Sequence, residues 1–154
     1  MTDPEHECIT FQVHGVPVPQ GSARAFVVKG RAIITSANRS LSVWRRLVAD
    51  TAQRYAPGEV WRGPVRLTLR FYVDRPKSEP THAGRGKDRH PIKTWPDRRP
   101  DLDKLVRAAM DSLTGVIFRD DSQVIDLRAT KEWGAPGVLV LVTRGTGLDP
   151  PSKR

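Results

Sequence analysis

Aspartates gather in one short segment of a chain that is otherwise strongly basic. The 154-residue sequence holds 17 acidic residues, and five of them lie within 21 positions: Asp101, Asp103, Asp111, Asp120 and Asp121. Carboxylate oxygens are the ligands that Mg²⁺ and Mn²⁺ prefer, and these ions assist the attack of water on phosphodiesters. The segment is therefore the first candidate for metal-assisted chemistry on a phosphate.

The spacing of these acids leaves two interpretations open. Asp101 and Asp103 would point to different sides of a regular helix, so they converge only if the chain after Pro100 is still extended or turning. The alternative is an N-cap and a first-turn acid, which the helix dipole favours. Asp120 and Asp121 are either metal ligands or ordinary turn residues before a strand.

A stretch of very different composition, residues 75–99, comes directly before these aspartates. It contains eight Lys or Arg, four Pro and hardly any aliphatic residue, so it predicts a long loop that packs no core. Trp95 within it either stacks on an exposed base or anchors the loop. The loop either pairs with DNA phosphates or is simply solvated, and its candidates for phosphate contact are Arg85, Lys87, Arg89, Lys93, Arg98 and Arg99.

The overall composition points to a nucleic-acid partner and excludes several other classes. The formal net charge is +9 and the sequence pI is about 10.4, which favours binding to a polyanion. The acidic start MTDPEHEC and the lack of a long apolar window predict a cytoplasmic protein without a membrane span. The single cysteine, Cys8, excludes an internal disulfide, and the absence of a phosphate-binding G-x-x-x-x-G-K motif gives no sign of a nucleotide cofactor. Further candidates for DNA contact outside the loop are Lys104, Arg24, Arg45, Arg46 and Lys131.

Hydrophobic periodicity predicts the elements that must position these residues. Apolar residues recur at helical spacing over 40–56 and 102–113, and alternate over 65–73. Further strands are expected over 9–18, 124–133 and 137–144, and a hairpin over 26–35 turns at Lys29 and Gly30. The order predicts one α/β (α+β) domain over 9–144, a small mixed sheet with two main helices, between flexible tails 1–8 and 145–154.

The segment PDLDKLVRAAMDSLTGVIFRDDSQVIDLRATKEWG resembles the signature region of the RusA-type Holliday-junction resolvases. D-L-D, an apolar helix ending D-x-L-x-G, and D-D-x-Q-V follow one another in the order of that family. VPVPQGSARA and KTWPDRRPDLDK fit it upstream. The resemblance implies a RusA-like fold and a homodimeric Mg²⁺-dependent endonuclease of phage or prophage origin, with Mn²⁺ as a substitute, that nicks four-way or branched DNA at two symmetric positions.

The resemblance also implies roles for individual residues. Asp101, Asp103 and Asp121 correspond to the metal-binding acids, and Asp120 to a secondary ligand or a structural neighbour. Arg107 falls where the family usually has a catalytic lysine, four positions after Asp103, so it either reaches the same phosphate or forms an i, i+4 ion pair. Arginine does not readily give up a proton, so Arg107 can stabilise charge but is a poor acid or base. Lys104 replaces a common asparagine, and its charge either lowers metal affinity or adds a phosphate contact.

Two other functions compete with a junction-resolving nuclease. One is a non-catalytic DNA-binding phage protein, whose acids cap a helix and fill turns. The other is a less selective metal-dependent nuclease, which would cut linear duplex or RNA equally well. The nuclease reading requires that three aspartates, distant along the chain, meet at one divalent cation.

Overall fold

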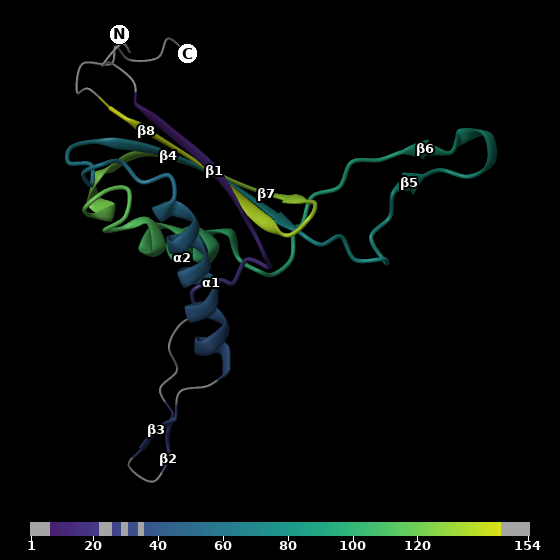
Figure 1. Ribbon diagram of the computed structural model, residues 1–154. Coiled ribbons are helices and arrows are strands. Elements are labelled where there is room, and N and C mark those ends of the chain that lie inside the picture. Colours follow the sequence, from purple (N-terminus) through teal and green to yellow (C-terminus); the bar gives the residue numbers. More distant parts are fainter. Residues whose placement is uncertain (1–6, 22–25, 29–30, 34–35, 146–154) are drawn as a thin grey trace.

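The chain folds into a four-stranded sheet with two helices packed against one face (Figure 1). The computed structural model describes residues 7–21, 26–28, 31–33 and 36–145. The strands are β1 (Cys8–His14), β4 (Val65–Val73), β7 (Val124–Trp133) and β8 (Gly137–Arg144), in the order β1-β8-β4-β7. The helices are α1 (Ser36–Gln53) and α2 (Leu102–Leu113). The expected α+β fold with a mixed sheet is confirmed, because β4 is parallel to β7 and antiparallel to β8.

The core lies between the sheet and the helices. In β4 the alternation places Val65, Leu67, Leu69 and Phe71 on the buried face. β8 adds three buried valines, and α2 adds Leu105 and a row of small and branched residues at helical spacing. Removal of this apolar surface from water is the main stabilising term of such a domain.

Most element boundaries agree with the periodicity, and the differences have local causes. β4, α2, β7 and β8 occupy the expected residues. β1 ends at His14 rather than near residue 18, because Pro17 and Pro19 cannot donate ladder hydrogen bonds. It also begins one residue earlier than expected, and the Glu7 carbonyl accepts a bond from the Arg144 backbone N–H at 2.9 Å.

The first helix and the hairpin also form. α1 covers 36–53 instead of 40–56. The expected hairpin is present as antiparallel β2 (Phe26–Val28) and β3 (Arg31–Ile33). Its turn residues Lys29 and Gly30, like the DNA-contact candidate Arg24, lie outside the described residues. Among the helices that the structure describes, none combines the length and apolar character that spanning a lipid bilayer requires.

The basic stretch 75–99, here called the basic arm, projects away from the sheet (Figure 1). It packs no part of the buried core except that Pro96 is covered at its base. It still has structure of its own: β5 (His82–Ala83) pairs with β6 (His90–Pro91) around a 3-10 turn, Gly86–Asp88. Backbone bonding continues below the strands, where the Ile92 N–H donates to the Thr81 carbonyl at 3.0 Å. The arm is therefore a two-stranded ribbon that carries its cations into solvent.

Replacement of Leu105 by alanine tests the core. The side chain is fully buried, so the lost contacts and the remaining cavity should lower the free energy of unfolding by about 2–5 kcal/mol. Val43 is 64% exposed, and the matched Val43→Ala change should cost less than about 0.5 kcal/mol. Urea denaturation measures both, and equal losses would contradict this position of the core.

Candidate active site

The first acid of the D-L-D motif lies where α2 begins. Asp101 occupies the N-cap position with extended backbone angles, φ −71° and ψ 132°, and the helix starts at Leu102. Its side chain makes no capping hydrogen bond. It forms an ion pair with Lys104 instead, with 2.8 Å between Lys104 Nζ and Asp101 Oδ2. Asp101 is therefore still extended, whereas Asp103 already lies in the first turn of the helix.

The ion pair sets the charge of Asp101. The pKa of its carboxyl group lies below the ordinary value of 3.8, first because Lys104 donates a hydrogen bond to it and second because of the charge on Lys104. Arg99 and Lys131 lower the pKa further. Asp101 is therefore a carboxylate at neutral pH, with one oxygen already engaged by a cation.

Asp103 and Arg107 stand free on the first turns of α2. Both side chains are exposed, and they share a helix face because four residues separate them. Neither forms an ion pair within 4.0 Å in the part of the chain that the structure describes. The i, i+4 ion pair that the sequence allowed is thus absent, and both groups remain available to a ligand.

Lys131 holds in place the segment of chain just before Asp101. Its ammonium donates to the carbonyl oxygens of Arg98 at 2.6 Å and Pro100 at 2.7 Å. The strand end that carries Lys131 is thereby tied to the residue before Asp101. Two other candidates for DNA contact also have partners in the chain: Arg45 lies 3.9 Å from Asp111 on α2, and Arg46 lies 3.8 Å from Asp50.

The D-D motif forms a capped turn at the start of β7. Asp120 is the N-cap of a 3-10 turn, Asp121–Gln123, and its Oδ1 accepts from the Ser122 N–H at 2.9 Å. The pKa of Asp120 is lowered first by a hydrogen bond from the Ser122 side chain and second by this backbone bond. The Gln123 Oε1 accepts from the Asp120 N–H at 2.8 Å and completes a capping box. Asp120 is thus a cap within the turn, and Asp121 beside it is exposed.

Gln123 also fastens this turn to a distant segment. Its Nε2 donates to the carbonyl oxygens of Trp61 at 2.9 Å and Gly63 at 2.8 Å. The sequence interpretation treated Gln123 only as part of a motif. The spacing D-x-x-Q signalled the capping box, but the contacts with residues 61 and 63 had no local signal.

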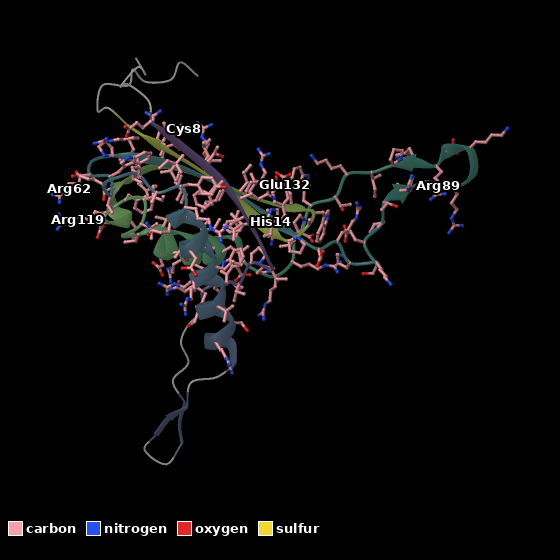
Figure 2. The ribbon with its side chains drawn as sticks, in the orientation of Figure 1. Cys8, His14, Arg62, Arg89, Arg119 and Glu132 are labelled. Carbon is pink, nitrogen blue, oxygen red and sulfur yellow. The ribbon has the colours of Figure 1, made fainter. Side chains whose placement is uncertain are left out.

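The two acidic motifs lie at opposite ends of the domain. α2 has 12 residues, so at about 1.5 Å per residue its ends are about 18 Å apart. β7 leads from the Asp121 turn back to Lys131, which touches Pro100 beside Asp101. Val124 and Lys131 are seven residues apart in that strand, a separation of about 23 Å at 3.3 Å per residue. Figure 2 agrees, because Arg119, next to the turn, lies far from Glu132, next to Lys131.

The three aspartates therefore do not meet within one chain. The described residues include no group of three His, Cys, Asp or Glu side chains that could hold a metal ion. Within one subunit α2 and β7 separate Asp121 from Asp101 and Asp103, so a metal site shared by the three aspartates stays a prediction. Asp101 and Asp103 remain a pair of neighbouring oxygen donors at the start of α2.

The basic arm begins and ends beside this pair. Its six candidate cations, Arg85, Lys87, Arg89, Lys93, Arg98 and Arg99, are all exposed, and Figure 2 shows Arg89 far out on the arm. Lys93 Nζ lies 4.2 Å from the centre of the Trp95 ring, which is 53% exposed. Trp95, Trp133 and Arg75 line a pocket of about 270 Å³ at the base of the arm. Lys104, the remaining candidate, is bound to Asp101.

Comparison with known proteins identifies the family of the chain. The sequence model of the family described as endodeoxyribonuclease RusA matches residues 14–143, which is most of the chain. The chain belongs to the RusA endodeoxyribonuclease family. It is also 31% identical over 137 residues to a Bacillus subtilis (strain 168) protein described as "Uncharacterized protein YqaN", covering 88% of this chain and 96% of that protein. Membership of the RusA family connects the chain with nucleases that act on branched DNA.

Replacement of Gln123 tests the clamp on the Asp121 turn. Gln123→Glu keeps an acceptor for the Asp120 N–H but cannot donate to Trp61 and Gly63, so the free energy of unfolding should fall by about 1–2 kcal/mol. Amide hydrogen exchange at residues 120–123 should accelerate. Gln12→Glu makes the same change at an exposed position of β1 and supplies the control, since it should leave exchange at residues 120–123 unchanged. Unchanged exchange in Gln123→Glu would show that the clamp does not hold the turn.

Replacement of Lys104 tests the charge of Asp101. The pKa of Asp101 is lowered in the folded protein, so the ion pair stabilises the fold at pH values above the ordinary pKa of 3.8. This stabilisation is lost as the pH falls through the pKa of the folded state. In Lys104→Asn, NMR titration should show the pKa of Asp101 raised toward 3.8. Lys87→Asn, on the arm, should leave it unchanged. An Asp101 titration that is the same in all three proteins would rule out the ion pair in solution.

Proposed function

We propose that this chain is a Mg²⁺-dependent endonuclease that resolves Holliday junctions as a homodimer by paired symmetric nicks. The observation that carries the proposal is the match to the RusA family together with two neighbouring carboxylates, Asp101 and Asp103, beside the unpaired Arg107. A basic DNA enzyme of this kind fits the cytoplasm of a bacterial or phage-infected cell. Nothing in the proposal calls for a nucleotide cofactor.

The donor set suits a hard divalent cation in part. Asp101 and Asp103 offer charged oxygens in one turn of chain, which is the ligand chemistry of Mg²⁺ and also of Mn²⁺. Such an ion, when bound, supplies Lewis acidity and an activated water for phosphodiester hydrolysis. Lys104 must release Asp101 before the full charge of that carboxylate is available to the metal. The Lys104 ammonium group therefore competes with the metal ion for Asp101.

Asp121 joins this site from a second copy of the chain. The lengths of α2 and β7 keep Asp121 away from Asp101 and Asp103 of its own subunit. In a symmetric dimer, the Asp121 end of each subunit can lie against the start of α2 in the other subunit, and this contact occurs twice. Each of the two sites then takes Asp101 and Asp103 from one subunit and Asp121 from the other. Asp120 keeps the turn in shape. Two such sites account for two nicks at symmetric positions.

The remaining side chains act on the DNA. Arg107 shares a helix face with Asp103, so its guanidinium can stabilise negative charge on the phosphate that is attacked. It has no role as a proton donor. The arm cations pair with backbone phosphates of the junction arms and fix the orientation of the DNA rather than its sequence. Lys131 keeps the start of α2 in position by holding the carbonyls of Arg98 and Pro100.

One observation favours a second function, a non-catalytic DNA-binding protein. A single subunit does not assemble three carboxylates, and Asp120 is fully explained as a cap. A binding protein would keep junction affinity without any metal-dependent cleavage. A less selective nuclease would instead cut linear duplex as fast as a four-way junction. The experiment below separates all three.

Complementation between two inactive variants tests the shared site. Asp101→Asn and Asp121→Asn homodimers should each lose Mg²⁺-dependent cleavage of a synthetic four-way junction by at least about 100-fold. When both variants are co-expressed with different affinity tags and the mixed dimer is isolated, one of its two sites has all wild-type acids. That dimer should regain cleavage, and its products should be single nicks rather than paired ones.

Three outcomes would contradict the proposal. Cleavage by Asp101→Asn at the wild-type rate removes the metal site at α2. A mixed dimer that stays inactive removes the sharing of Asp121 between subunits. Wild-type protein that binds the junction but never cleaves it, or cleaves linear duplex equally well, leaves one of the two alternative functions.

A further inference from the structure

The end of the domain that carries Asp121 also holds two exposed arginines, Arg62 and Arg119. Arg62 and Arg119 line a cleft of about 410 Å³ together with Glu59, Val60 and Gly115. Figure 2 shows both arginines at the same end of the molecule, on neighbouring segments. We propose that Arg62 and Arg119 bind one DNA phosphate in this cleft, next to Asp121. This inference rests on the proposed function, because it assigns the cleft to the same DNA.

Backbone pairing explains why the two arginines line the same cleft. Trp61 forms a β-bridge with Phe118, its N–H donates to the Ile117 carbonyl at 2.8 Å, and the Arg119 N–H donates to the Trp61 carbonyl at 3.2 Å. Trp61 and Phe118 are buried. In extended chain, successive side chains point to opposite sides, so the residues that follow, Arg62 and Arg119, both face solvent on the same edge.

The charge balance of the cleft favours an anion. Neither Arg62 nor Arg119 forms an ion pair within 4.0 Å in the part of the chain that the structure describes. The lining of the cleft holds two cations and one acid, Glu59, and the charge of Arg119 also acts on the nearby carboxyl group of Asp120, whose pKa it helps to lower. A phosphate that accepts from both arginines would use the net positive charge of the lining. Guanidinium groups match phosphate oxygens in bidentate geometry.

The phosphate site and Asp121 form one rigid unit. Gln123 holds the Asp121 turn to the carbonyls of Trp61 and Gly63, which flank Arg62. Arg119 precedes Asp121 by two residues on the other side of the cleft. When Asp121 of a second copy enters an active site, the two arginines necessarily come with it. They would therefore anchor a phosphate of the strand that is cut or of its neighbour along the backbone.

Salt-dependent binding of a four-way junction in EDTA tests the cleft without cleavage. The double variant Arg62→Gln/Arg119→Gln should bind about 10-fold more weakly, and its plot of log affinity against log salt should lose about 0.9 in slope, the value for one phosphate. Arg128→Gln removes an exposed arginine of β7 that pairs with Asp126 and should leave the slope unchanged. An equal slope in the double variant and the control would overturn the proposal.

A neutral phosphate in the DNA supplies a second, independent readout. Methylphosphonate placed at successive positions near the exchange point should weaken binding of the wild type at one position about 10-fold and cause no further loss there in the double variant. Losses that add at every position would overturn the site. If the double variant does not fold, Arg62→Lys/Arg119→Lys takes its place. This variant keeps both charges but lacks the bidentate guanidinium groups, so it should bind the junction more weakly than the wild type. Wild-type protein that binds but does not cleave contradicts the nuclease, while both tests of the cleft remain valid.

Discussion

The direction of β7 relative to α2 is the constraint on which the rest of the structure depends. At one end, Lys131 of β7 holds the carbonyls of Arg98 and Pro100, just before Asp101. At the other end, Gln123 holds the turn before β7 to Trp61 and Gly63. Both fastenings are side-chain donors bound to backbone oxygens, and the strand between them sets the spacing of the two acidic motifs. The two acidic motifs are thereby held at opposite ends of one subunit.

This spacing gives a physical reason for the symmetry of the proposed reaction. A nuclease that holds all its acids in one subunit can act as a monomer, and paired cleavage would then need a separate device. A nuclease whose acids lie about 20 Å apart, as the lengths of α2 and β7 require, has no active site until two subunits meet. Two sites then form at once and on opposite sides of a two-fold axis. The basic arm and the arginines beside Asp121 place positive charge at both ends of each subunit.

The parallel pairing of β4 and β7 produces the separation of the two acidic motifs. Local sequence patterns did not predict this pairing. Parallel neighbours require a long crossover, and here the crossover is the basic arm followed by α2. The alternation of β4 predicted its bounds and its buried face, because period-two hydrophobicity depends only on neighbouring residues. Nothing in that alternation specifies which strand lies beside it. The end of β1 was also overestimated, since the apolar residues around Pro17 and Pro19 continue a hydrophobic run that cannot continue a ladder.

By itself, the sequence determined the elements, the separation of a core from a cationic arm, and the identity of the acids in the D-L-D and D-D motifs, because these depend on residue type and short spacing. Only the tertiary structure decided that Asp101 is held by Lys104, that Arg107 is free, and that Asp120 is a cap. It also decided that Asp121 lies with Arg62 and Arg119 and away from the other two acids. The first three are choices among local alternatives that the sequence left open, whereas the place of Asp121 follows from strand order and helix direction, which no local pattern encodes.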